Sequence, residues 1–257
     1  MPKKLAEFLG DKVHLNAPLA SVSKTAAGSY HLSFANGLEA DADLLVLAMP
    51  CSVYNDIAFE KNVIPEEKLE AIKKVEYGTV TRMVFPAPSL GEKCRPIFTD
   101  SMLLLRSPTL PYFTAYCVGE SSRFDEKTVA QTFAEAQKIA GVEGFLSASA
   151  PALARDELFA AYEGPVAHSW PNDPYVKGSY SYIAAGQEEV LTAMDEICGV
   201  PARALFAPID GHLFFAGEHT TVLLDGIGTI EAACESGERA ALLIEKIVSK
   251  SPLPAIK

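Results

Sequence analysis

LFFAGEHTTVLLDGIGTIEAA, residues 213–233, combines a short apolar strand, a turn and the beginning of a long helix. The predicted strand, residues 213–216, runs directly into a Gly-Glu-His-Thr turn, and the predicted helix fills residues 229–249. Two glycines before a helix let the backbone approach a ligand closely, and the free N–H groups at a helix start favour an electron-rich oxygen. An ordinary loop and cap would look the same. Strand, turn and glycine-flanked helix together favour a cofactor.

A second apolar run, residues 44–48, fits a strand that is covered on both faces, as strands of parallel sheets are. It stops at Met49-Pro50, and open α/β sheets bind ligands where the chain leaves such strands.

Periodicity predicts the remaining elements. Apolar positions of the long helix predict a buried side made of Ile230, Ala233, Gly237, Ala240 or Ala241, Ile244, and Ile247 or Val248. Asn36-Gly37 suits a type I′ hairpin turn, which needs positive φ at both central residues. Other predicted helices cover residues 3–9 and 125–140, the latter packing within its own lobe; other predicted strands cover residues 13–15, 29–34, 79–85 and 112–118.

Composition indicates a globular chain with a sizeable core. The 257 residues exceed the usual prior of about 150 per domain, so one large domain or two lobes are both allowed. A net charge of -11 makes nucleic acid and anionic membranes poor partners. No apolar run approaches the roughly 20 residues that cross a bilayer, and we expect no signal peptide.

Cysteine and histidine usage narrows the chemistry. Five cysteines without a CxxC pair suit a reduced, cytoplasmic protein. His212, Glu218 and His219 are too few and too poorly spaced for a metal site, so we expect no metal. The serines lack a GxSxG elbow, which argues against a serine hydrolase.

Four stretches resemble the flavin-containing amine oxidases, a family that includes monoamine oxidases, polyamine oxidases and lysine-specific histone demethylases. They are residues 13–18 with 40–50, residues 77–78 with the following strand, residues 170–182, and residues 214–237. The resemblance implies an α/β (α+β) fold with an incomplete FAD-binding, Rossmann-like lobe built from residues 1–50 and 166–257. Residues 51–165 would form an α+β substrate lobe.

The resemblance also implies roles for individual residues on the cofactor side. Val13 would contact adenine, and Ala48 and Pro50 would line the dinucleotide. Gly217 and Glu218 match a pair near the pyrophosphate and ribityl chain. The backbone at the helix start would face the flavin pyrimidine; its residues are Gly228, Thr229 and Ile230.

On the substrate side, Trp170 would pack beside the isoalloxazine, and Tyr180 would guide a small amine with its π-face. Covalent members carry a cysteine where this chain has Ser179, so FAD should bind noncovalently. Arg82 stands where the family has a lysine that holds a water at flavin N5. Arginine cannot act as a neutral base, and Arg82 serves equally well as a surface or ion-pairing residue.

The family's N-terminal GxGxxG turn, which grips pyrophosphate, is missing from this sequence. We therefore expect the C-terminal portion of an FAD-dependent amine oxidase, inactive alone and completed by an N-terminal FAD-binding half or subunit. Completed, it would oxidise an amine to an imine by hydride transfer to flavin and reduce O2 to H2O2. A degenerate, noncatalytic interaction module and a protein that binds another ligand in the remaining cleft are the alternatives. Uncovered apolar surface also predicts a homodimer.

Overall fold

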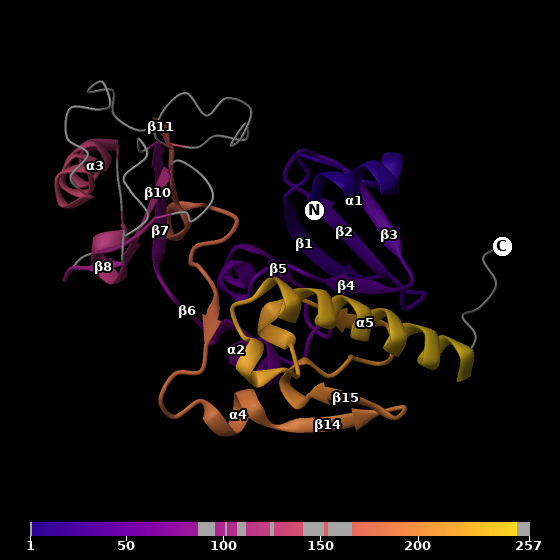
Figure 1. Cartoon of the computed structure of the whole chain (residues 1–257). Coiled ribbons are helices and arrows are strands. Elements are labelled where there is room, and N and C mark those ends of the chain that lie inside the picture. The colour runs from indigo at the N-terminus through magenta and orange to yellow at the C-terminus, as the bar shows by residue number, and fades with distance from the viewer. Residues whose placement is uncertain are drawn as a thin grey trace. The chain divides into compact units, whose positions relative to one another are not determined.

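The computed structural model describes residues 2–86, 96–100, 102–106, 112–123, 126–140, 152–153 and 166–250 (Figure 1). It contains both helices and strands, as the predicted α/β class requires. The chain forms two compact units, Met1–Val75 with Ile183–Lys257, and Glu76–Tyr182. Within the described part, no helix combines the length and apolar character that a membrane span needs.

The bounds of these units differ from the expected ones of 1–50, 51–165 and 166–257, because two segments pack elsewhere. Helix α2 (Glu66–Lys73) belongs to the first unit, where the Lys68 ammonium donates to the Ala207 carbonyl at 2.7 Å. Strand β12 (Val166–Ser169) pairs with β7 (Val80–Pro86) in the second unit.

A four-stranded sheet of order β3-β2-β1-β5 opens the first unit. Its strands are β1 (Leu19–Lys24), β2 (Tyr30–Phe34), β3 (Glu39–Ala42) and β5 (Ala58–Phe59). Tyr30 and Leu32 are buried, as the alternation in this segment predicts. Because burial raises the pKa of the Tyr30 hydroxyl, with Asp210 adding to the shift, this phenol stays neutral.

The hairpin between β2 and β3 forms, but the predicted type I′ turn is wrong. Gly37 has a φ of 85°, whereas Asn36 is not among the described residues with positive φ. The Leu38 carbonyl accepts from Phe34 N at 2.9 Å, so the turn takes the longer form with glycine in the left-handed position. The Asn36 amide holds this geometry by donating to the Asn16 carbonyl at 2.8 Å.

Two further strands of the first unit pair in parallel. Strand β4 (Leu45–Leu47) lies beside β16 (Leu213–Phe215) in the register Leu45 with Leu213. All three residues of β16 are buried, and Phe214 packs with Leu243 of helix α5 (Ile230–Lys250). Both predicted apolar runs are therefore strands, but the prediction that the run over residues 44–48 is covered on both faces is wrong, since Val46 of β4 is 40% exposed.

The predicted buried side of α5 is confirmed only in the second half of the helix, where Ala240 is buried and Ile244 and Ile247 pack against the core. In the first half it is wrong, because Ile230 is 66% exposed and Ala233 and Gly237 are exposed as well. The inward residues are Ala232, Ser236, Arg239, Ala240 and Leu243. Ser236 and Arg239 are polar, so hydrophobic periodicity could not identify this face; their partners lie in the turn that follows β16.

The remaining elements of the first unit are short. Helix α1 (Pro2–Leu9) continues into η1 (Gly10–Lys12), and the predicted strand over residues 13–15 is irregular chain instead. The other elements are η2 (Cys51–Asp56), α4 (Glu188–Thr192), β14 (Met194–Ile197), β15 (Val200–Arg203), η5 (Ala204–Phe206), η6 (Glu218–Thr220) and η7 (Leu224–Gly226).

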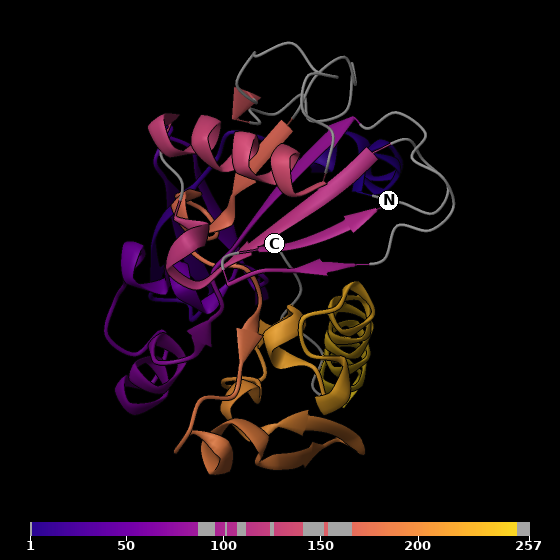
Figure 2. The ribbon, with the colours of Figure 1, turned by 60° about the vertical axis from the view of Figure 1, so that its left-hand side comes forward.

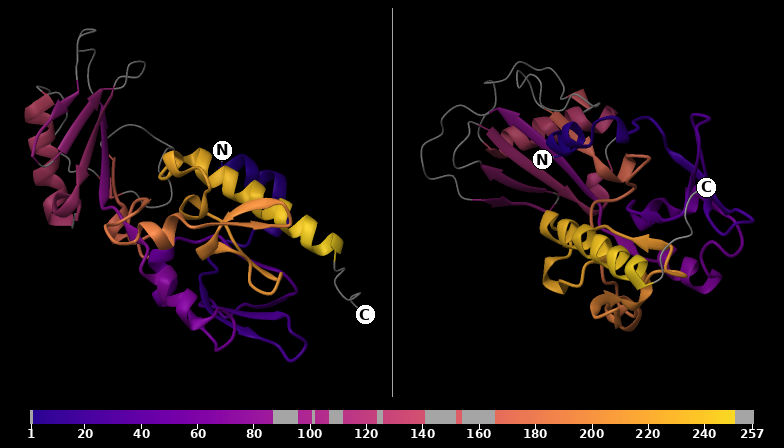
Figure 3. Two further views of the ribbon diagram at one scale, coloured as in Figure 1. Left: turned by 90° about the horizontal axis from the view of Figure 1, so that it is seen from below. Right: turned by 90° about the vertical axis from the view of Figure 1, so that its right-hand side faces the viewer.

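The second unit is a six-stranded sheet of order β11-β12-β7-β10-β9-β8 with one covering helix, α3 (Glu126–Ala140) (Figures 2 and 3). Met83, Leu104 and Ala115 face α3 and pack with its Phe133 and Ala136. The other elements are β6 (Glu76–Tyr77), β8 (Ile97–Phe98), β9 (Met102–Arg106), β10 (Tyr112–Val118), η3 (Gly119–Ser122), β11 (Ala152–Leu153), η4 (Trp170–Asn172) and β13 (Ser181–Tyr182).

The two faces of this sheet should respond differently to truncation. Leu104 is fully buried, so Leu104→Ala should lower the free energy of unfolding by about 2–5 kcal/mol through lost burial and a cavity. Leu103→Ala on the opposite face of β9 is the control and should cost less than about 1 kcal/mol. Urea unfolding followed by circular dichroism measures both. Equal losses would contradict this division of the sheet.

His31 should make the β2–β3 hairpin sensitive to pH. Its hydrogen bond with Asp41, Nδ1 to Oδ1 at 2.7 Å, raises the pKa of His31. A raised folded-state pKa stabilises the protein fully below the unfolded value of about 6.5, and that contribution is lost as pH rises through the folded pKa. The gap in melting temperature between wild type and His31→Gln should therefore be wider near pH 5 than near pH 9. A gap that is constant with pH would refute this.

Candidate functional site

The carboxyl ends of β4 and β16 meet at one edge of the first unit. Phe215 pairs with Leu47, and Ala216 N donates to the Leu47 carbonyl at 3.0 Å. Ala48 and Pro50 therefore leave the sheet beside Gly217, as the sequence predicts. Loops at the carboxyl ends of parallel strands are where open α/β folds bind ligands. Binding roles for these residues remain predictions.

Gly217 is a position that only glycine fits. Its φ is 129°, and a Cβ added there would overlap the imidazole ring of His219. Its N–H donates to Ser236 Oγ of α5 at 2.8 Å. The chain can therefore turn sharply at the end of β16 and remain attached to the helix.

Glu218 connects the turn after β16 with the loop before α5. Its Oε2 accepts the Gly228 N–H at 3.1 Å, so the two segments that the resemblance assigns to the cofactor lie in contact. The side chain of Glu218 is only partly buried.

Thr229 caps the start of α5. Its hydroxyl donates to the Gly226 carbonyl at 2.6 Å and accepts the Ala232 N–H at 3.2 Å. The N–H groups of Ile230 and Glu231 have no hydrogen-bond acceptor among the described residues, and both residues are exposed. The helix start can thus receive an oxygen acceptor from outside the chain.

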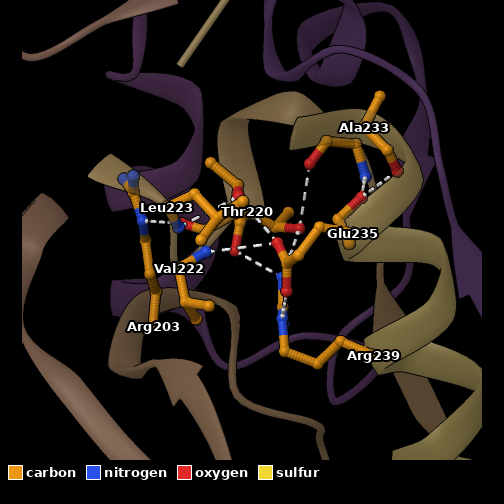
Figure 4. Close-up of polar contacts among 10 residues, drawn as sticks. Arg203, Thr220, Val222, Leu223, Ala233, Glu235 and Arg239 are labelled. Atoms are coloured by element: carbon orange, nitrogen blue, oxygen red, sulfur yellow. Dashed lines mark hydrogen bonds and ion pairs between the residues drawn. The ribbon is translucent and has the colours of Figure 1, made fainter. Parts of the chain in front are cut away.

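A charged network from α5 holds the turn after Glu218 (Figure 4). Glu235 binds both the Thr221 hydroxyl, at 2.6 Å, and the Val222 N–H, at 3.3 Å. Its other oxygen pairs with Arg239 Nε at 2.6 Å, and Arg239 Nη2 donates to the Thr220 carbonyl at 2.6 Å. Although burial raises the pKa of Glu235, hydrogen bonds from Arg239 and Thr221 outweigh it, so the pKa is lowered overall.

Arg203, at the end of β15, approaches the same turn from the opposite side (Figure 4). Its Nε donates to the Thr221 carbonyl at 2.5 Å and its Nη1 to the Leu191 carbonyl at 2.9 Å. The residue is 2% exposed.

His219 is a neutral core residue. Burial, aided by the charge of Arg203, lowers the pKa of His219 to about 3. The ring lies edge-on to Phe206 with centroids 5.2 Å apart. Within the described ranges, no three His, Cys, Asp or Glu side chains gather as they would around a metal ion.

The predicted substrate-side residues Arg82, Trp170 and Tyr180 all belong to the second unit. The Arg82 guanidinium lies 4.5 Å from the centre of the Tyr116 ring, on the sheet face opposite α3. His168 is the cross-strand neighbour of Arg82 and contacts Trp170, with ring centroids 4.1 Å apart. Tyr116, Arg82 and His168 form a row of one cation and two rings across the neighbouring strands β10, β7 and β12.

Close glycine contacts join the two remaining stretches of the resemblance. A Cβ on Gly178 would lie 2.6 Å from Tyr77 Cβ, and one on Gly78 would lie 3.0 Å from Ser179 Oγ. Gly78 N donates to the Tyr180 carbonyl at 2.9 Å, which fixes the backbone at Tyr180. Tyr180 itself is 49% exposed.

The structure thus brings together Ala48, Pro50, Gly217 and Glu218 with the helix start from Gly228 to Ile230. Val13 donates to the Gly10 carbonyl, and among the described residues no hydrogen bond connects it with that group.

Sequence reasoning missed the supporting side chains Arg203, Glu235, Ser236 and Arg239. The i,i+4 spacing of Glu235 and Arg239 is typical of an ion pair and could have identified two of them.

Replacing a glycine by alanine should destabilise the protein at Gly217, in the site, but not at Gly237, on the exposed side of α5. Gly217→Ala should lower the free energy of unfolding by about 2 kcal/mol or more, because the residue has positive φ and His219 blocks the Cβ. Gly237→Ala is the control: its Cβ would meet open space on a helix, so it should be neutral or stabilise by up to about 1 kcal/mol. Chemical denaturation measures both, and a tolerated Gly217→Ala would refute this geometry.

Comparisons with known proteins give the family and the fold of the chain. A family model described as flavin containing amine oxidoreductase matches residues 1–244. The fold is similar to that of a putrescine oxidase, a triple mutant from a structure-based redesign of cofactor binding, with a TM-score of 0.67 and 17% identity. That similarity covers 97% of this chain and 52% of the oxidase, so the chain spans about half of its length. No curated protein matches the sequence. Because the family model covers nearly all of the sequence, the chain belongs to the flavin-containing amine oxidoreductase family.

Proposed function

We propose that this chain supplies one part of the flavin site of an FAD-dependent amine oxidase. The observation that carries the proposal is the contact between Glu218 and Gly228, which joins the end of a buried parallel strand to the start of a capped helix. Strand ends and helix starts of this kind bind nucleotide cofactors in α/β folds. We assign the first unit to an incomplete Rossmann-like lobe.

The residues present fit a flavin in part. Glu218 offers a carboxylate to hydroxyl groups of the cofactor, and the helix start offers the N–H groups of Ile230 and Glu231 to its oxygens. Gly217 lets the backbone turn without a side chain in the way. Ser179 stands where covalent members carry cysteine, so we propose noncovalent binding.

The pyrophosphate of FAD lacks a binding motif in this sequence, which contains no GxGxxG turn. Without that helix start, the two phosphate charges lose several hydrogen bonds and much of their charge compensation. We therefore propose that FAD binding requires a further segment with this motif, supplied by a partner subunit or a neighbouring part of a longer chain.

A bound flavin would supply the chemistry, accepting a hydride from the α-carbon of a small amine. The chain's own residues would orient the substrate and exclude water. Trp170 and Tyr180 present partly exposed aromatic faces suited to an amine. An arginine cannot act as a neutral base, so Arg82 would not take a proton from the amine.

The arginine at position 82 also favours a second candidate function, that of a noncatalytic family member which acts as an interaction module. With arginine at the family's lysine position, the water expected at flavin N5 loses its ligand, and reaction with oxygen would be impaired. In this case the partner would be another protein. The cytoplasmic location and a homodimer remain proposals.

Completing the site should create a flavoprotein. The chain alone should purify colourless, whereas co-expression with a GxGxxG-bearing segment of the family should give a yellow complex. Glu218→Ala should weaken FAD binding by about tenfold or more, because a hydrogen bond to a charged group is lost. Glu238→Ala, an exposed acid on α5, is the control and should bind normally.

Fluorescence titration with FAD measures these affinities, and the same complexes can be assayed for amine-dependent peroxide. Tight FAD binding by the chain alone, or a colourless complex, would contradict the proposal. A yellow complex without amine oxidation would instead support the noncatalytic candidate.

A further inference from the structure

Arg203 is a buried cation that makes no direct ion pair with any residue that the structure describes. Its Nε and Nη1 donate to backbone carbonyls, those of Thr221 and Leu191, and its Nη2 is buried with no hydrogen-bond acceptor among the described residues. Burying a charge in this way is costly unless hydrogen bonds and nearby charges compensate it. Arg239 differs, because Glu235 neutralises it directly at 2.6 Å.

The contacts of Arg203 lead to Glu218 through one residue. Thr221 gives its carbonyl to Arg203, and its N–H donates to the Glu218 carbonyl at 3.2 Å. The backbone that Arg203 holds is therefore the same short turn that places the Glu218 side chain against Gly228.

Electrostatics points to the same pair. Burial lowers the pKa of Arg203, and among the charges that act on it Glu218 is the strongest, opposing that shift ahead of Glu235. The region holds two cations, Arg203 and Arg239, and two acids, Glu218 and Glu235, so its formal charges balance.

We propose that Arg203 is a positioning residue, which fixes the turn after Gly217 and serves as counter-ion to Glu218, so that this carboxylate stays on the Gly228 amide. An effect of Arg203 on cofactor binding rests on the proposed function, in which Glu218 binds hydroxyl groups of the cofactor. Arg203 would then act on cofactor binding without touching the cofactor.

Amide hydrogen exchange at Gly228, measured by NMR on the full chain without flavin, tests the proposal. Arg203→Met should speed exchange at Gly228 by about tenfold, because the amide would lose the protection that roughly one hydrogen bond gives. Arg203→Lys should speed it less, because lysine keeps the charge and can reach one of the two carbonyls. The amide of Val22, in β1, reports global loosening and should change much less.

Lys246→Met is the matched control, since the Lys246 ammonium donates to the Cys198 carbonyl at 3.2 Å in the same unit but away from the turn. It should leave Gly228 exchange within twofold of wild type. Arg203→Met exchange within that range, or a rise at Gly228 that only matches the rise at Val22, would overturn the proposal.

A second measurement covers the case in which Arg203→Met does not fold. Glu218→Gln keeps an acceptor for Gly228 but removes the charge, and by reciprocity it should shift the side-chain Nε–H resonance of Arg203. Glu245→Gln, an exposed acid later on α5, should not. An unchanged Arg203 signal in Glu218→Gln would refute the counter-ion role.

Neither measurement uses flavin, so the two proposals fail separately. A colourless complex with the GxGxxG-bearing segment would refute the flavin proposal and leave the Gly228 response intact. An unresponsive Gly228 amide in a yellow complex would refute the role of Arg203 alone.

Discussion

Hydrogen bonds from buried cations to backbone carbonyls are the interaction on which the candidate site depends. The chain after β15 and β16 forms only the short 3-10 helices η5 and η6, so its carbonyls lack the ladder partners that a sheet would provide. Arg203 and Arg239 bind the carbonyls of Thr221 and Thr220, and Lys68 binds that of Ala207. Burial lowers the pKa of Lys68 to about 8, which reflects the cost of placing a cation there. This arrangement lets a single 3-10 turn and the loop after it keep one shape, as a binding loop requires.

The same turn connects fold to proposed function. Parallel pairing of β4 and β16 brings two loops to one edge, and Glu218 joins that edge to the start of α5. The family match implies a flavin cofactor, which is consistent with the proposed site. The groups in this unit suit hydroxyls and carbonyl oxygens better than two phosphate charges, which is why the proposal includes a further segment. The aromatic row near Arg82 belongs to the second unit and would act on the substrate.

Sequence patterns predicted the elements but not the side chains that support the site. β4, β16 and α5 were predictable because apolar runs and helical periodicity are strong signals. The inward face of the first half of α5 was not, since Ser236 and Arg239 point inward to partners that are distant in sequence. Asn36 misled for a similar reason: its side chain binds Asn16, and the hairpin adopts another turn. The unit boundaries depend on long-range pairing, such as β12 with β7, which local composition does not encode.

The most direct test of the central claim is to map FAD onto the backbone amides of this chain by NMR, in complex with the GxGxxG-bearing segment. We predict that FAD shifts the signals of Gly217, Gly228 and Ile230 while those of the β1–β2 hairpin stay in place. Unchanged signals at these three residues, with FAD bound to the complex, would show that the cofactor lies elsewhere and would contradict the claim.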